Sequence, residues 1–244
     1  VLLLIYFPNL YQYDVNSGGS IPPYRFGHSH WPHTPLSTMS YSELSDNARE
    51  IIARFTLATS QEIQLGLDWY PSARSIATRI GKKYRQDPYT VSAVISALSP
   101  NCRWEDNIQD AERLCKVFHA GGTDADLNEV TTRAYPLNQQ LAIRILRTGV
   151  PSILTGPKRQ EFYNCIMYPD LNDVCIDTHA YSVWLGVRVT AKTCPNLAGK
   201  KFRARIKQDY HDACAFINEE LGESYKTADI QAITWVTHKR IHNI

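Results

Sequence analysis

The sequence predicts an all-α protein, and three observations lead to this fold class. Apolar residues recur at the spacing of a helix face from about residue 45 to the last residue. No stretch of useful length alternates apolar and polar residues, which is the pattern of a half-buried strand. Glycine, proline and small polar residues stand where the periodic segments begin and end. The 244 residues, 43% of them hydrophobic, can bury one large core or two lobes.

Residues 1–38 differ from the rest of the chain. They open on VLLLIYFPNL, an apolar run that lacks the basic start and cleavage site of a signal peptide and is too short to cross a bilayer. The sequence that follows is rich in Gly, Ser, Pro and His and has no periodicity. We therefore expect a disordered or extended leader over 1–38 and a helical domain over 39–244. Met39 directly precedes the first helical pattern, so we expect natural translation to start there.

The first half of the domain contains four helical patterns. Gly66-Leu67-Asp68 predicts a break between the first two, and Ser99-Pro100 ends the third. Gly121-Gly122 stops the fourth. The expected helices are Ser45–Leu65, Pro71–Tyr84, Pro88–Leu98 and Arg103–Phe118.

The second half contains five further helical patterns and a tight turn. Gly149 and Gly156 bound the turn, which opens at Pro157 into a helix and forms a hairpin over residues 150–166. The other expected helices are Leu137–Arg147, Thr178–Leu185, Ala198–Leu221 and Thr227–His242.

Charge and cysteine content exclude some classes of protein. A net charge of +2 is too small to identify a nucleic-acid-binding protein. The six cysteines include no C-x-x-C pair, so their spacing suits neither a zinc site nor a four-cysteine iron–sulfur loop. Most of them lie in apolar helical patterns, which is typical of buried free thiols in a reducing compartment. We expect a cytoplasmic monomer with no metal, no small-molecule cofactor and no membrane contact.

Asp177 is an isolated acid between the apolar run 174–176 and a helical pattern that begins at Thr178. An aspartate in this place is typical of a helix N-cap, whose carboxylate accepts backbone N–H bonds. A cap alone is one interpretation of Asp177, and a carboxylate with a chemical role is the other.

Two segments together resemble the helix-hairpin-helix (HhH-GPD) DNA glycosylases, the superfamily of endonuclease III, the adenine-mismatch glycosylases and the 8-oxoguanine glycosylases. In that family a Leu-Pro-Gly-Val-Gly hairpin leads into a helix and is followed by an apolar-Asp-Thr/Val-His segment. The similar segments here are LTGPK at 154–158 and IDTH at 176–179. Upstream, residues 91–118 are similar to the family's Leu-Ser-x-Gln/Asn loop and the helix that follows it. The resemblance covers residues 45–244 and implies a two-lobed helical fold.

The resemblance implies that Asp177 is the catalytic acid, which stabilises the positive charge that develops on the sugar when a base leaves. It also implies a lysine nucleophile in bifunctional members, and here Lys158 lies nineteen residues before Asp177 while Arg159 lies eighteen before it. The alternative is that both cations contact phosphate at the helix start, together with Gly156. Pro157 departs from the family pattern and removes one N–H donor. We favour a monofunctional glycosylase, which removes the base and does not cleave the strand.

Further candidate residues follow from the need to flip a base and fill the gap it leaves. Asn101 and Arg103 lie in a polar loop suited to insertion into DNA, although the loop also reads as a simple helix connection. The candidate base pocket contains Trp104, Asn107, Trp69, Tyr70 and His179, with core packing as the alternative for the aromatic residues.

A basic segment precedes Asp209 and carries Lys200, Lys201 and Arg203. On a helix, Lys200, Arg203 and Lys207 share one face. Such a face is either a solvated surface or a contact to the DNA backbone, and binding through it weakens as salt rises.

The resemblance therefore implies a DNA glycosylase that binds double-stranded DNA, flips one nucleotide and hydrolyses its N-glycosidic bond to leave an abasic site. A modified or damaged base is the expected target, and a glucosylated hydroxymethylcytosine of phage DNA, removed in anti-phage defence, is one hypothesis. The alternatives are a non-catalytic helix-hairpin-helix protein that only binds DNA and a helical structural or phage-assembly protein.

Overall fold

The computed structural model describes residues 40–244, and every regular element in that range is a helix. The all-α prediction is confirmed for this part of the chain. The expectations for residues 1–38 and the start at Met39 lie outside the described residues. The α-helices are α1 (Asp46–Thr56), α2 (Ser60–Tyr84), α3 (Pro88–Leu98), α4 (Trp104–His119), α5 (Asp124–Glu129), α6 (Pro136–Thr148), α7 (Pro157–Met167), α8 (Thr178–Leu185), α9 (Lys200–Leu221) and α10 (Thr227–His242). Three short 3₁₀ turns are η1 (Tyr41–Glu43), η2 (Pro151–Ile153) and η3 (Pro169–Leu171).

The predicted break at Gly66-Leu67-Asp68 is wrong, because α2 runs through it and also contains Pro71. The real break lies at 57–59, where Thr59 caps α2 and Glu62 returns a bond to the cap. Gly66 is needed for packing: a Cβ there would lie 2.4 Å from Ile233 Cγ1 on α10. Pro71 lies on the exposed side of the helix, where the Leu67 carbonyl loses its usual donor. The short helix α5 was not predicted.

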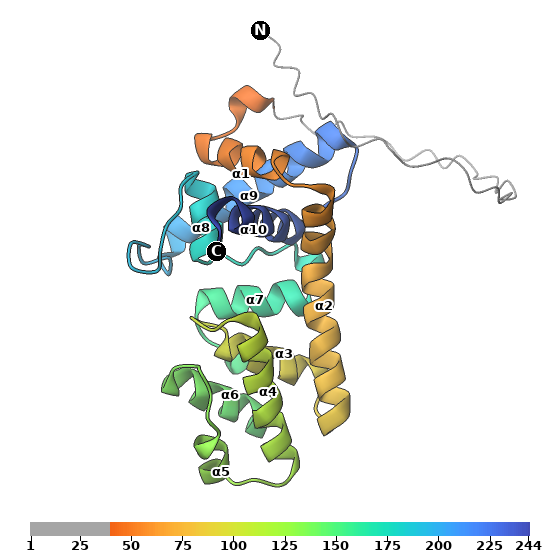
Figure 1. The fold of residues 1–244 in the computed structure, drawn as a ribbon, viewed down its shortest axis with the longest axis vertical. Helices are drawn as coiled ribbons and strands as arrows, with labels where there is room; N and C mark the ends of the chain where they lie inside the picture. The colour runs from red at the N-terminus through yellow and green to blue at the C-terminus, as the bar shows by residue number, and fades with distance from the viewer. Residues whose placement is uncertain (1–39) are drawn as a thin grey trace, which may run out of the picture. The chain divides into compact units, whose positions relative to one another are not determined.

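Two hydrophobic clusters form the interior of residues 40–244. One gathers side chains of α2 to α7 and includes Ile95, Leu114 and Ile145. The other gathers side chains of α1, α8, α9 and α10 and includes Ile51 and Tyr210. In Figure 1 helix α7 lies between the two groups of helices, and α2 runs along both. Residues on α7 can therefore contact helices of both clusters.

The chain between α6 and α7 is bounded by Gly149 and Gly156, and α7 begins at Pro157. Gly149 ends α6 with φ of 63°, and after η2 the chain reaches Gly156, which is the N-cap of α7. Residues 172–177 then have no helical structure and lead into α8, whose bounds match the prediction. Helix α9 begins at Lys200, two residues later than Ala198.

No helix among residues 40–244 is both long and apolar enough to cross a membrane. All six cysteines are free thiols, and four of them are buried (Cys115, Cys165, Cys175 and Cys214). The prediction of buried free thiols is confirmed for those four.

Candidate functional site

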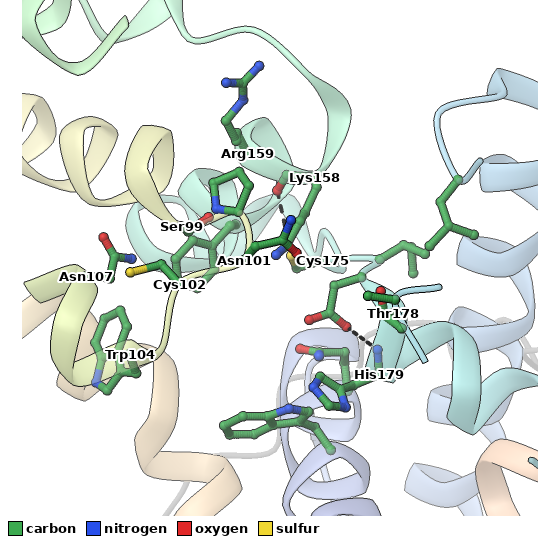
Figure 2. A pocket seen from close by; sticks show the side chains of 18 of the residues that line it. Ser99, Asn101, Cys102, Trp104, Asn107, Lys158, Arg159, Cys175, Thr178 and His179 are labelled. Carbon is green, nitrogen blue, oxygen red and sulfur yellow. Dashed lines mark hydrogen bonds between the residues drawn. The ribbon is translucent and has the colours of Figure 1, made fainter. Parts of the chain in front are cut away.

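A cavity of about 1160 Å³ opens where the two hydrophobic clusters adjoin. Its walls come from α2, the 99–104 loop, α4, the starts of α6 and α7, the 175–179 segment, the loop after α8, the first turn of α9 and α10. The structure brings most of the predicted site residues to this cavity: Trp69, Tyr70, Asn101, Arg103, Trp104, Asn107, Gly156, Lys158, Arg159, Asp177, His179 and Arg203. Figure 2 shows the labelled side chains around it.

Asp177 is the N-cap of α8, as its position in the sequence predicts. Its Oδ1 accepts bonds from the backbone N–H groups of His179 and Ala180, both at 2.9 Å. The other oxygen, Oδ2, has no hydrogen-bond partner among the described residues, and no cation lies within 4.0 Å of the carboxylate in that range. Because half-buried Asp177 also lines the cavity, one oxygen holds the helix and the other remains available to a ligand.

Lys158 and Arg159 differ in what they bind. Arg159 donates from Nη1 to Asn138 Oδ1 at 2.7 Å, and Figure 2 shows it turned away from Thr178 and His179. The Lys158 side chain has no ion pair or hydrogen bond among residues 40–244, and its backbone carbonyl accepts a bond from the Cys175 thiol. Lys158 is therefore the free cation of the pair.

The start of α7 is built to leave backbone donors available. Gly156 has φ of 88°, which side-chain-bearing residues rarely adopt, and a Cβ there would meet the Arg159 guanidinium at 2.8 Å. No side chain caps the helix. The first-turn N–H groups and the helix dipole favour an anion at this point.

The 99–104 loop presents Asn101 outward. Asn101 is exposed, has φ of 56°, and donates from Nδ2 to the hydroxyl of Tyr135 at 3.0 Å. Asparagine tolerates this left-handed conformation better than most residues. Arg103 is 83% exposed and pairs with Asp106 at 2.8 Å. The 99–104 loop therefore gives the cavity a rim with two exposed polar side chains, Asn101 and Arg103.

Aromatic side chains line the inner part of the cavity. The Trp69 ring centroid lies 5.3 Å from that of Trp104 and 4.6 Å from that of Trp235. Phe162 meets Trp104 edge-on at 6.2 Å. Tyr70 is buried and donates to Gln231 at 2.8 Å, and burial, followed by nearby Cys165, Cys175 and Asp177, raises the pKa of its hydroxyl well above 10.

Asn107 is the polar group of this aromatic wall. It is 2% exposed, and its Oδ1 is buried with no hydrogen-bond partner. A buried amide left without a partner costs about 1 to 3 kcal/mol. Such a group suits the edge of a planar ligand that offers a matching donor and acceptor.

His179 lies beside Asp177 at the cavity and faces other aromatic rings. Its ring centroid lies 6.4 Å from that of Trp235 and 6.3 Å from that of His238. His238 is fully buried, and neither of its ring nitrogens has a partner. Burial, followed by the neighbouring His242, Arg54, His179 and Arg188, lowers the pKa of His238 to about 4.

Two thiols line the cavity, Cys102 and Cys175. Burial, with Asp177 as the next cause, raises the pKa of Cys175 well above 9. Burial, followed by Asp110 and Asp106, also raises the pKa of Cys102. Both thiols stay protonated at neutral pH, which makes them weak nucleophiles.

The prediction that Arg203 faces DNA beside Lys200 and Lys201 is wrong. Arg203 is 6% exposed and pairs with Glu161, with Nε and Oε1 at 2.6 Å. Lys207 pairs with the same carboxylate at 2.9 Å. Of the three residues predicted to contact DNA from this segment, Lys200 and Lys201 are exposed and have no ion pair among the described residues, and they follow the cavity-lining Leu197 and Ala198.

Some cavity and rim residues were not predicted. Arg188, Gln231 and Lys239 line the cavity, and Glu161 lies behind it. Leu137 is 78% exposed next to the rim residue Tyr135, which is 57% exposed. The sequence signal for this pair is Tyr-Pro-Leu at a helix start. The two large side chains flank the proline, outside the apolar face of the helix that follows.

Within residues 40–244, no group of three or more His, Cys, Asp or Glu side chains is arranged to hold a metal ion.

The chain belongs to a family of unknown function, DUF7178, whose profile matches residues 33–242. No curated protein matches the chain. No solved structure matches it.

Proposed function

We propose that this protein is a DNA glycosylase with a helix-hairpin-helix (HhH-GPD) fold, which flips a base of duplex DNA into the cavity and hydrolyses its N-glycosidic bond. The observation that carries the proposal is the carboxylate of Asp177. One of its oxygens is fixed by two backbone N–H bonds, and the other is uncommitted at a cavity wall.

Breaking the bond between a base and its sugar builds positive charge on the sugar. A carboxylate that is already oriented stabilises this charge without reorganisation during the reaction. The cap bonds supply that orientation for Asp177. The same carboxylate can orient the attacking water, in the way that acids act in glycoside hydrolysis.

The placement of basic residues supports duplex DNA as the partner. Among the described α-helices, α7 and α9 are the two whose N-termini bring adjacent basic residues, Lys158-Arg159 and Lys200-Lys201, with no acid in the first turn. Cations at a helix N-terminus oppose the helix dipole, so this arrangement is stabilised when an anion binds there. Two such termini at one cavity suit the phosphates on either side of a flipped nucleotide.

The inner cavity suits a base. Trp69, Trp104 and Phe162 offer faces and edges for stacking, and Asn107 offers an unpaired amide for the base edge. On the rim, Asn101 and Tyr135 are exposed side chains that can fill the gap in the duplex, and exposed Leu137 lies two residues after Tyr135. The cavity is larger than the upper end of the usual range for small-ligand sites, about 1000 Å³. This size supports an enlarged base, including a sugar-modified pyrimidine of phage DNA, as a substrate.

The test is base release from a panel of DNAs by the native protein and by Asp177→Ala. The panel contains plain, uracil-containing and oxidised duplexes, and genomic DNA with hydroxymethylated or glucosylated cytosine. We expect abasic sites on one substrate and none with Asp177→Ala. Release by both proteins, or by neither on any DNA, contradicts the proposal. Salt-sensitive DNA binding without release by either protein favours a non-catalytic DNA-binding protein.

Lys158 raises a second question, namely whether the enzyme also cleaves the strand. A free lysine near Asp177 can attack C1′ as the base leaves, giving a Schiff base that borohydride reduces to a stable adduct. We expect a monofunctional enzyme, because the Lys158 side chain has no hydrogen-bond or ion-pair partner among the described residues that would hold it against the sugar. A covalent DNA adduct that forms with borohydride and disappears in Lys158→Ala would contradict this expectation.

A further inference from the structure

The segment that leads to Asp177 is held by side chains instead of a neighbouring strand. The backbone N–H of Ile176 donates to Glu161 Oε2 at 3.0 Å, and the Ile176 carbonyl accepts from Arg203 Nη2 at 2.6 Å. Both backbone groups of the residue before Asp177 are therefore bonded to two charged side chains, one from α7 and one from α9.

The two side chains also bind one another. Arg203 Nε donates to Glu161 Oε1 at 2.6 Å, and Arg203 Nη2 makes a second contact with Oε2. Glu161 is 4% exposed and Arg203 is 6% exposed. A two-point arginine–carboxylate pair fixes orientation as well as distance. Removing one partner from such a buried pair leaves the other charge uncompensated, so the arrangement has little freedom to shift.

Further bonds close the network on both sides. Arg203 Nη1 donates to the Leu197 carbonyl at 2.9 Å. Lys207 pairs with Glu161 at 2.9 Å and with Asp173 at 2.6 Å. Burial works against the charged form of Asp173, but the bonds from Lys207 and Asn164 outweigh it and lower the pKa of Asp173. The extended segment is thus held at Asp173 and again at Ile176.

We infer that Glu161 and Arg203 are positioning residues, a clamp that sets where the Asp177 carboxylate stands relative to Lys158 and the start of α7. Glu161 lies one turn after Lys158 on α7, so one carboxylate links the Lys158 helix to the residue before Asp177. The inference rests on the proposed function for its chemical consequence. A shift of about 1 Å in a reacting group can lower the rate on the order of 10²-fold.

The chain contains a matched control. Glu62 accepts the backbone N–H of Thr59 at 2.8 Å, while Arg240 donates to Glu62 at 2.6 Å and to the Leu57 carbonyl at 2.8 Å. This arrangement repeats the clamp's bonding pattern at the start of α2, outside the cavity lining. The variants Glu62→Gln and Arg240→Lys therefore report what the loss of this bonding pattern does away from the cavity, where the arginine is 51% exposed and not buried as Arg203 is.

The test uses the full chain and two duplexes with a synthetic abasic site, one with neutral tetrahydrofuran and one with a cationic pyrrolidine. The pyrrolidine imitates the charged sugar, so preference for it measures how well Asp177 meets that charge. We expect Glu161→Gln and Arg203→Lys to reduce the preference on the order of 10²-fold toward the value for Asp177→Asn. Their affinity for the tetrahydrofuran duplex should stay within the range of the Glu62→Gln and Arg240→Lys controls.

Amide hydrogen exchange provides a readout that does not depend on catalysis. Arg203→Lys keeps the positive charge and much of the side-chain bulk, so it serves if Glu161→Gln does not fold. In Arg203→Lys we expect faster exchange at Ile176, His179 and Ala180 than in Arg240→Lys. An unchanged pyrrolidine preference or unchanged exchange at these amides overturns the inference. If the native protein itself shows no preference for pyrrolidine, the proposed role of Asp177 fails, and the exchange measurement alone decides whether the clamp holds the segment.

Discussion

At the scale of single residues, the Asp177 carboxylate uses only one of its two oxygens as a helix cap. Asp177 Oδ1 caps α8, while the other oxygen is free at the cavity wall. A cap and a reactive acid were alternatives in the sequence, and the geometry allows both together. The two capping bonds use only Oδ1, so the cap leaves Oδ2 available to a ligand.

His238 predicts how the stability of the protein depends on pH. Its folded-state pKa of about 4 lies below the ordinary value of 6.5, so the unfolded chain takes up a proton first as pH falls. Its contribution to stability is complete above pH 6.5 and declines between 6.5 and 4, with a slope that approaches about 1.4 kcal/mol per pH unit. We expect His238→Phe to flatten the decline in urea unfolding measured across this range.

The control for that experiment is His119→Phe, which changes an exposed histidine at the end of α4. It should leave the pH dependence of unfolding as in the native protein. An equally steep decline in His238→Phe would contradict the assignment to this ring.

At the scale of helices, the start of α9 makes a prediction about DNA binding. Lys200 and Lys201 are exposed and unpaired at a helix N-terminus next to the cavity lining. Each phosphate contact contributes about 0.9 to the slope of log K against log salt for duplex DNA. The double variant Lys200→Gln/Lys201→Gln should therefore lower the magnitude of this slope by up to about 1.8 in binding titrations at several salt concentrations.

A charge-matched control uses Lys82→Gln/Lys116→Gln, since both lysines are exposed and lie outside the cavity lining. Equal slopes of log K against log salt for the two double variants would show that the start of α9 does not contact the DNA backbone.

The contact between α2 and α10 makes a prediction about stability. Alanine normally strengthens a helix relative to glycine by about 1 kcal/mol. At Gly66 the added Cβ would lie 2.6 Å from the Ile233 Cα, so the helices must separate. We expect Gly66→Ala to lower the free energy of unfolding by about 1 to 3 kcal/mol in urea titrations, while Gln61→Ala on the exposed face stays near the native value. A stabilised Gly66→Ala protein would contradict this packing.

At the scale of the whole molecule, the predictions that depend on local signals match the structure, and those that depend on contacts between distant residues do not. The bounds of α3, α8 and α10 match the prediction, because Pro88, Asp177 and the Gly and Asn residues at the helix ends act on their own neighbours. The break at Gly66 was predicted wrongly because the reason for that glycine lies on α10, far away in sequence. Arg203 was predicted to be on the surface because its partner Glu161 lies 42 residues away.

The site residues also divide into those that a local motif predicts and those that only the fold brings to the cavity. Asp177, Lys158 and the 99–104 loop carry motifs, so the sequence indicated them. Arg188, Lys239 and Gln231 carry none, and they join the cavity only because the loop after α8 and one side of α10 fold beside it. Asn107 was predicted by its helical spacing from Trp104, but its unpaired buried oxygen is visible only in the structure.

The most direct test of the central claim is the base-release rate of Asp177→Asn, measured in single turnover on whichever DNA the native protein acts on. Asparagine caps helices about as well as aspartate, so this variant removes the charge and keeps the cap. We predict an unfolding midpoint close to that of the native protein and a rate lower by at least about 10²-fold. Release at the native rate would show that the Asp177 carboxylate only caps α8.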